Sequence, residues 1–212
     1  MKKTLLVEPH PDDICLSLYH YIKLGIFKNS FLVTLSNPNR EDSFNFCKAV
    51  GIEFIYPLNI PDIDWSLRMK LRDIKDYKNS YNIFINYYKD YINRLERVTY
   101  KKLKRVINNL NIDNIICPLG ILHPFHVFTR YIIEKFKDKH IYYYADVPYQ
   151  YRVYGNKIVE ASGKLYDCYK PTKKEVESKI EAFLKYYKSQ RNILLNKWNE
   201  ASNLYKGEKI LV

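Results

Sequence analysis

Residues 4–13 of the chain read TLLVEPHPDD, an apolar run followed at once by a histidine and two adjacent aspartates. The run at 5–7 predicts a buried strand, and helical spacing begins near Ile14. A histidine and two carboxylates are costly to place beside a core unless the molecule uses them. The stretch therefore predicts a strand–turn–helix unit whose turn carries functional side chains.

Further compact apolar runs alternate with helical patterns along the chain. The expected strands are TLLVEP (4–9), SFLVTLS (30–36), EFIYPL (53–58), NIICPL (114–119) and HIYYYADV (140–147). Helical spacing covers 14–28, about 40–50, about 79–110, 124–138 and about 172–199. This alternation predicts an α/β fold, a Rossmann-like open and mostly parallel sheet with helices on both faces, in a single domain over residues 1–212. The segment 57–70 looks irregular and could cover a site.

The composition is that of a folded, basic protein. The 212 residues are 47% hydrophobic and 16% aromatic, which excludes a disordered chain. The formal net charge of +12 suits an anionic partner, although an AT-rich coding sequence would produce the same lysine, asparagine, isoleucine and tyrosine content. Residues 68–105 hold twelve Lys or Arg against four Asp or Glu, interleaved with tyrosines. A nucleic-acid surface can have this pattern, but a solvated helix face over an apolar stripe is the favoured interpretation. Nucleic acid is therefore not the expected partner.

The N-terminus and the cysteines bear on the compartment. MKKTLLV begins like a signal peptide, but Glu8 and Pro9 end the apolar stretch, and no run approaches the ~20 apolar residues of a membrane span. The four cysteines are scattered without paired spacing, which is typical of small thiols in a reducing compartment. We therefore expect a soluble cytoplasmic protein.

A second histidine-containing stretch follows the expected strand 114–119. It reads GILHPFH at 120–126, so it falls at the carboxyl end of its strand as PHPDD does. The carboxyl ends of parallel strands share one edge of a sheet, where ligands bind, and the two clusters should therefore converge. His10, Asp13 and His126 would then make a three-ligand zinc site with an open fourth position, the pattern of catalytic zinc.

Two further side chains complete the expected chemistry, and each has a simpler interpretation. Asp12 would be a free carboxylate able to take a proton from zinc-bound water, and His123 could stabilise an oxyanion or protonate a leaving amine. Alternatively, Asp12 and Asp13 could cap the following helix, and His123 could be a helix-start residue before a proline. The position of both clusters at strand ends favours the metal site. His20 and His140 lack such company and are expected to be surface or structural residues.

These motifs resemble those of the PIG-L-type (LmbE-like) zinc-dependent N-deacetylases. EPHPDD at 8–13 matches the family's first motif, and GILHPFH at 120–126 matches its second, His-Pro-x-His. REDSFNFCKAVGIE at 40–53 is similar to the helix after the family's second strand, and KIEAFLKYYKSQ at 179–190 is similar to its C-terminal helix with a Ser-Gln ending. The matches follow the family's order and cover nearly the whole chain.

The resemblance implies a role for each matching residue. The implied zinc ligands are His10, Asp13 and His126. Asp12 would be the general base, and His123 would be the general acid or oxyanion stabiliser. Arg40 and Glu41 would lie near the substrate rim, with a solvated helix start as the open alternative. The implied reaction hydrolyses the acetamide of a small N-acetylated substrate, usually an N-acetylglucosamine unit within a larger conjugate, to a free amine and acetate.

The chain departs from the family pattern at three positions. Ile14 stands where an acidic residue usually follows His-Pro-Asp-Asp, Phe125 replaces the aspartate of His-Pro-Asp-His, and Ile121 stands where some relatives carry a tyrosine. None of the zinc ligands is altered, so the resemblance implies zinc binding more directly than turnover. Three alternatives therefore remain open. They are a hydrolase of another N-acylated metabolite in a specialised biosynthetic pathway, a zinc-retaining non-catalytic relative, and a polyanion-binding relative.

Overall fold

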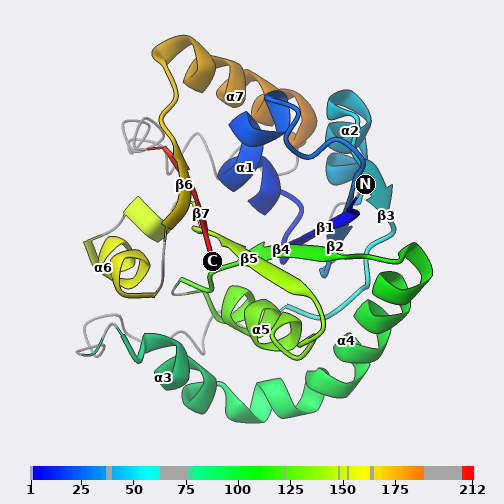
Figure 1. The fold of residues 1–212 in the computed structure, drawn as a ribbon, viewed down its shortest axis with the longest axis vertical. Helices are drawn as coiled ribbons and strands as arrows, with labels where there is room; N and C mark the ends of the chain where they lie inside the picture. Colours follow the sequence, from blue (N-terminus) through cyan, green and yellow to red (C-terminus); the bar gives the residue numbers. More distant parts are fainter. Residues whose placement is uncertain are drawn as a thin grey trace.

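One seven-stranded sheet organises the part of the chain that the computed structural model describes (Figure 1), namely residues 2–36, 40–62, 76, 78–121, 123–147, 149–151, 153–162, 165–188 and 207–212. Its strands are β1 (Thr4–Glu8), β2 (Ser30–Thr34), β3 (Glu53–Ile55), β4 (Asn114–Pro118), β5 (His140–Tyr144), β6 (Leu165–Tyr169) and β7 (Glu208–Leu211). The strand order is β3-β2-β1-β4-β5-β7-β6. The first five strands are parallel, and β7 runs antiparallel to both β5 and β6. The predicted open, mostly parallel sheet is confirmed, and β6 and β7 are additions that the sequence did not reveal.

The predicted helices are present, several with shorter limits, whereas α6 (Val153–Ser162) was not predicted. In chain order the helices are α1 (Asp13–Lys23), α2 (Arg40–Val50), α3 (Ser80–Tyr87), α4 (Lys89–Leu110), α5 (Pro124–Ile133), α6 and α7 (Lys173–Tyr186), with a 3₁₀ turn at Tyr149–Tyr151. The helix expected at 14–28 ends early, because Gly25 adopts a φ of 75°. The pattern over 79–110 is divided at Tyr88 into α3 and α4. The helix predicted to 199 is described as far as Tyr186, and residues 189–206 lie outside the described part.

The alternation of side chains along β1 separates two cores. Leu5 and Val7 pack into the core that also receives α3, α4, α5 and α6, whereas Leu6 packs into the core beneath α1, α2 and α7. Figure 1 shows these two groups of helices on opposite sides of the sheet. Because successive residues of a strand face opposite ways, an uninterrupted apolar run such as 5–7 needs both layers.

The long helix α4 bears on the basic stretch at 68–105. Its apolar stripe is buried through Ile92, Leu103 and Ile107, and its lysines and arginines lie on the exposed side. Over residues 89–105 this arrangement is that of a solvated helix face, whereas residues 68–75 and 77 of the basic stretch lie outside the described part. Within the described ranges, no helix is both long enough and apolar enough to cross a membrane.

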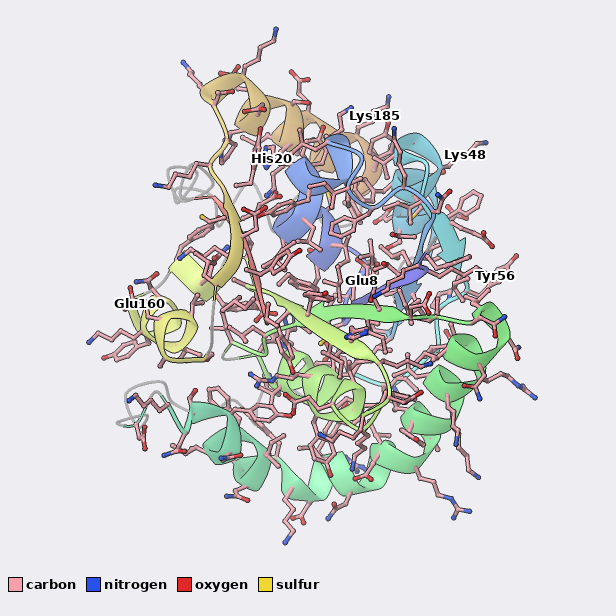
Figure 2. All side chains as sticks on the ribbon, in the orientation of Figure 1. Glu8, His20, Lys48, Tyr56, Glu160 and Lys185 are labelled. Atoms are coloured by element: carbon pink, nitrogen blue, oxygen red, sulfur yellow. The ribbon has the colours of Figure 1, made fainter. Side chains whose placement is uncertain are left out.

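A buried ionic cluster fixes the C-terminal strand. Glu208 of β7 accepts hydrogen bonds from Lys179 Nζ (2.7 Å) and from the His20 backbone N–H (3.0 Å), and its carboxylate lies 2.9 Å from His20 Nδ1. All three side chains are almost fully buried. His20, which Figure 2 labels on α1, is therefore a structural residue, and His140 is exposed at the start of β5. The cluster joins α1, α7 and β7. The Lys209 carbonyl of β7 also accepts a hydrogen bond from the Ala145 N–H over 3.0 Å.

Candidate metal centre

The first half of the site is the turn between β1 and α1. The backbone N–H of His10 donates to Asp13 Oδ2 over 2.8 Å, which turns the Asp13 carboxylate back toward the histidine. Asp12 occupies the N-cap position of α1, but its side chain makes no capping hydrogen bond. The capping alternative is therefore wrong for Asp12. The Asp12 carboxyl instead feels the charges of Asp13, His10 and His126.

The second half is the turn between β4 and α5. Gly120 has a φ of 80°, and a Cβ there would lie 3.1 Å from the Val127 Cα, so this tight approach requires glycine. His123 caps α5, because its Nδ1 accepts the Phe125 N–H over 3.3 Å. His126 lies in the first turn of the same helix. Because β4 pairs directly with β1, this turn lies beside the first one, and the predicted convergence of the two clusters is present.

His10, Asp13 and His126 bring four candidate ligand atoms together, because each of the two Asp13 carboxylate oxygens lies near a different histidine. His10 Nδ1 lies 3.3 Å from Asp13 Oδ2, Asp13 Oδ1 lies 3.3 Å from His126 Nε2, and His126 Nε2 lies 3.3 Å from His10 Nδ1. Tetrahedral zinc with nitrogen and oxygen ligands at ~2.0–2.2 Å separates those atoms by ~3.3–3.5 Å. The two histidine nitrogens therefore have the spacing of zinc ligands, and each has an Asp13 oxygen at that same distance, so the donor set suits a zinc ion.

A second grouping replaces Asp13 by His123. One nitrogen from each of His10, His123 and His126 lies within 4.8 Å of the others. We favour the first set, because its atoms already have the spacing of metal ligands. In addition, the neutral His123 imidazole must carry its proton on Nε2, since Nδ1 accepts the Phe125 N–H. A protonated Nε2 is a hydrogen-bond donor and not a ligand. Its ring lies 4.9 Å from the His10 ring and 4.7 Å from the His126 ring, centre to centre.

Two aspartates that sequence reasoning missed stand behind the histidines. Asp146 Oδ1 lies 2.7 Å from His126 Nδ1, and Asp146 Oδ2 accepts the Ile121 N–H over 2.7 Å. Asp62 Oδ2 lies 2.9 Å from His10 Nε2. In the sequence, only the position of each aspartate hinted at a role. Asp146 lies near the end of the run 140–147, and Asp62 falls in the irregular segment 57–70. Residues 63–70 of that segment lie outside the described part.

Burial and neighbouring charges both shift the pKa values of this cluster. They oppose each other at His10 and Asp13, whereas burial and the Asp13 charge act together at Asp12. Burial acts to lower the pKa of His10, but hydrogen bonds and charge from Asp13 and Asp62 outweigh it and raise that pKa to about 10. Burial also opposes ionisation of Asp13, yet the charge of His126 and the bonds to His10 lower its pKa. Burial and then the charge of Asp13 raise the pKa of Asp12 to about 7. A bound divalent cation would lower the Asp12 pKa and keep this carboxylate ionised.

Glu8 anchors the first turn from below. Its Oε1 lies 2.7 Å from both Thr34 Oγ1 and Ser43 Oγ, and Ser43 Oγ lies 2.9 Å from the Pro11 carbonyl. Burial raises the pKa of Glu8 to about 8, so the side chain is mostly protonated at pH 7. A protonated Glu8 carboxyl can donate its proton to Ser43 Oγ. The Ser43 hydroxyl then donates its own proton to the Pro11 carbonyl. Glu8, labelled inside the molecule in Figure 2, is thus connected through Ser43 of α2 to the turn, and its protonated form adds no charge.

The positions that depart from the family pattern are apolar and buried. The Phe125 ring lies 5.4 Å from the His10 ring and stacks on Phe128 at 6.0 Å, centre to centre. Ile121 is also fully buried. A tyrosine does lie beside the histidines, because the Tyr149 ring is 5.7 Å from His123 and 5.6 Å from His126, centre to centre.

The expected substrate-rim residues lie at the start of α2. This helix follows β2, so it begins at the same edge of the sheet as the metal centre. Glu41 is exposed in its first turn, and Arg40 is the first helical residue, with its side chain outside what the structure describes. Their role in substrate binding stays a prediction.

Solved structures share this fold, whereas no protein-family model and no curated protein matches the sequence. A deacetylase–bog complex from the teicoplanin biosynthesis pathway is 15% identical with a TM-score of 0.62, covering 99% of this chain and 97% of that chain. The zinc-inhibited form of teicoplanin deacetylase Orf2 is 15% identical with a TM-score of 0.63 and the same coverage, 99% and 97%. The N,N'-diacetylchitobiose deacetylase from Pyrococcus horikoshii is 17% identical with a TM-score of 0.53, covering 99% of this chain and 82% of that chain. At these identities the likeness establishes a common fold, so the fold implied by the resemblance to PIG-L-type deacetylases is confirmed.

Proposed function

We propose that the protein is a zinc-dependent N-deacetylase that removes an acetyl group from an N-acetylated sugar conjugate. The observation that carries the proposal is the clustering of ligand atoms from His10, Asp13 and His126, in which the two histidine nitrogens lie 3.3 Å apart and each lies 3.3 Å from one Asp13 oxygen. Its position at the carboxyl ends of two adjacent parallel strands, in a fold shared with deacetylases, adds support.

In this proposal His10, Asp13 and His126 hold the metal. When bound, zinc supplies Lewis acidity that polarises an amide carbonyl and brings the pKa of water toward ~7. Asp12, which is not spent on a helix cap, takes the proton from the attacking water. The His123 ring lies beside the other two imidazoles, and its Nε2–H can donate to the developing oxyanion or to the departing amine nitrogen.

The substrate class rests on the structural neighbours. Their titles name teicoplanin biosynthesis and N,N'-diacetylchitobiose, and the N-acetyl group of an amino sugar is the group that a deacetylase would hydrolyse in compounds of this kind. Phe125 favours a second candidate, a different N-acylated metabolite, because its ring makes the wall next to His10 apolar. Both candidates require the same metal and the same base and differ only in the substrate. Amine release measured over a panel of substrates therefore separates them.

The test begins with metal content and proceeds to turnover. Purified protein loaded with zinc should hold about one ion per chain, and His10→Ala or Asp13→Ala should abolish it. Amine release is then measured over a panel of N-acetylated sugars, sugar conjugates and non-sugar N-acyl amines, with and without a chelator. Chelator-sensitive release from the sugar compounds supports the proposal. Wild-type protein that stays free of metal after loading would overturn the site.

A further inference from the structure

We infer that Asp62 is a positioning residue of the metal centre, because it holds His10 with Nδ1 toward the metal. The inference rests on the proposed zinc site. It adds to the centre a residue from the connection after β3. This residue belongs to neither of the two histidine motifs, at 8–13 and 120–126. It also makes the loop at 56–62 part of the centre, although the loop contributes no ligand.

The two nitrogens of the His10 ring face different partners. Nδ1 lies 3.3 Å from both Asp13 Oδ2 and His126 Nε2, whereas Nε2 lies 2.9 Å from Asp62 Oδ2. A neutral imidazole has one proton, and the carboxylate of Asp62 attracts that proton to Nε2. The Nδ1 lone pair is then directed at the other two ligands. Asp62 itself is on the far side of the ring from Asp13, so it cannot share their ion.

The loop that carries Asp62 is fixed to the sheet and to α4. The Leu58 N–H donates to Thr34 C=O over 3.0 Å, and the Ile60 N–H donates to Leu35 C=O over 2.8 Å. The Tyr91 hydroxyl donates to the Pro61 carbonyl over 2.7 Å, directly before Asp62. Ile60 is 3% exposed and packs into the core. The carboxylate is thus held by its backbone at a defined place beside His10.

Asp146 provides an internal comparison, because it backs His126 in the same way at 2.7 Å. His10 and His126 therefore each have a carboxylate on the ring nitrogen that faces away from the proposed metal. Loss of such a partner typically weakens metal affinity about 10- to 100-fold. Because the Asp62 side chain is 34% exposed, water can partly replace it, and we expect its loss to weaken affinity about 10-fold, the lower end of that range.

The experiment measures the zinc dissociation constant by chelator competition for wild type, Asp62→Ala and Asp62→Asn. Asp138→Asn is the control, since Asp138 is an exposed aspartate paired with Lys139 and remote from the histidines. Asp62→Ala should bind zinc about 10-fold more weakly than wild type. Asp62→Asn should weaken binding less, because its amide oxygen can still accept the His10 proton. The control should match wild type.

Two further readouts separate positioning from a general structural role. Without zinc, the Asp62 variants should still unfold cooperatively as folded proteins, as Asp138→Asn does, while the rise in unfolding temperature on adding zinc should be smaller for Asp62→Ala. In ¹⁵N-histidine spectra of the zinc-loaded wild type, the His10 Nε2 should carry a proton. Zinc binding by wild type that is equally tight in both Asp62 variants would overturn this inference and leave the proposed function intact. Failure of wild type to bind zinc would overturn the proposed function itself.

Discussion

Replacement of Asp146 by asparagine should weaken zinc binding by a magnitude that the hydrogen bonds define. The two carboxylate oxygens of Asp146 each receive one buried donor, the Ile121 N–H at 2.7 Å and His126 Nδ1 at 2.7 Å. Asparagine has the same shape but only one acceptor oxygen, since its other terminal group is an NH₂ donor. The variant can therefore satisfy one of the two partners and not both.

Each orientation of the new amide penalises the form that binds zinc. If the oxygen stays with Ile121, the NH₂ group faces His126 Nδ1, which must then accept. The imidazole proton moves to Nε2 and removes the lone pair that points at His10 and Asp13. If the oxygen turns to His126, the NH₂ group faces the Ile121 N–H and two buried donors oppose each other. An unsatisfied buried group costs about 1–3 kcal/mol, which corresponds to a zinc dissociation constant about 5- to 150-fold weaker.

The assay is competition for zinc between the protein and a chelator at pH 7, for wild type and Asp146→Asn. Asp113→Asn serves as the matched control, because the Asp113 carboxylate also accepts a backbone N–H, from Lys3. This bond lies at the amino ends of β1 and β4, whereas the metal centre lies at their carboxyl ends. Circular dichroism confirms that both variants are folded. Affinity in Asp146→Asn equal to that of wild type would refute the reasoning, since it would mean that the tautomer of His126 does not limit metal binding.

Three further outcomes are expected. Asp12→Asn should retain zinc but lose about 10²- to 10⁴-fold in kcat, the usual contribution of a general base, and unchanged turnover would exclude Asp12 from proton transfer. Glu208→Gln should lower the free energy of unfolding in urea at pH 7 by about 3–5 kcal/mol, because it leaves the buried Lys179 ammonium without its partner. Burial acts to raise the pKa of Glu208, but the charge of Lys179 outweighs it and lowers this pKa below its ordinary value. Wild type should therefore lose stability as the pH falls through the lowered pKa, because Glu208 then becomes protonated. Glu208→Gln should lose less stability over the same pH range. Gly120→Ala should cost about 1–3 kcal/mol in thermal unfolding, because the left-handed backbone at φ 80° disfavours a side chain, and a neutral result would contradict the close approach to Val127.

The sequence predicted the elements that bury continuous apolar runs and missed those that do not. Strands β1, β2 and β4 are covered on both faces, so their composition alone identifies them. By contrast, β6 reads LYDCY and is largely exposed at the edge of the sheet, while β7 is only four residues long. Their places depend on long-range contacts such as the bond between Glu208 and Lys179, which no local pattern encodes.

The same division applies to the site. His10, Asp13, His123 and His126 stand in two short motifs at strand ends, so their spacing and position were enough to bring them together. Asp62 and Asp146 are single aspartates in irregular connections, and nothing near them in sequence indicates a partner. Their role depends on which histidine nitrogen the fold places opposite them, and that is a three-dimensional property.

The metal centre lies where the strand order changes direction. From β1 the chain moves outward through β2 and β3, and it then returns to place β4 on the other side of β1. The helices after β1 and β4 pack on opposite faces of the sheet, and the two turns that carry the site lie between them. Two departures from the family pattern lie on these opposite faces, since Ile14 belongs to the core beneath α1 and Phe125 to the core beneath α5. Both positions therefore contribute packing where the family has acids, and the carboxylates on the outer nitrogens of His10 and His126 come instead from the connections after β3 and β5, through Asp62 and Asp146.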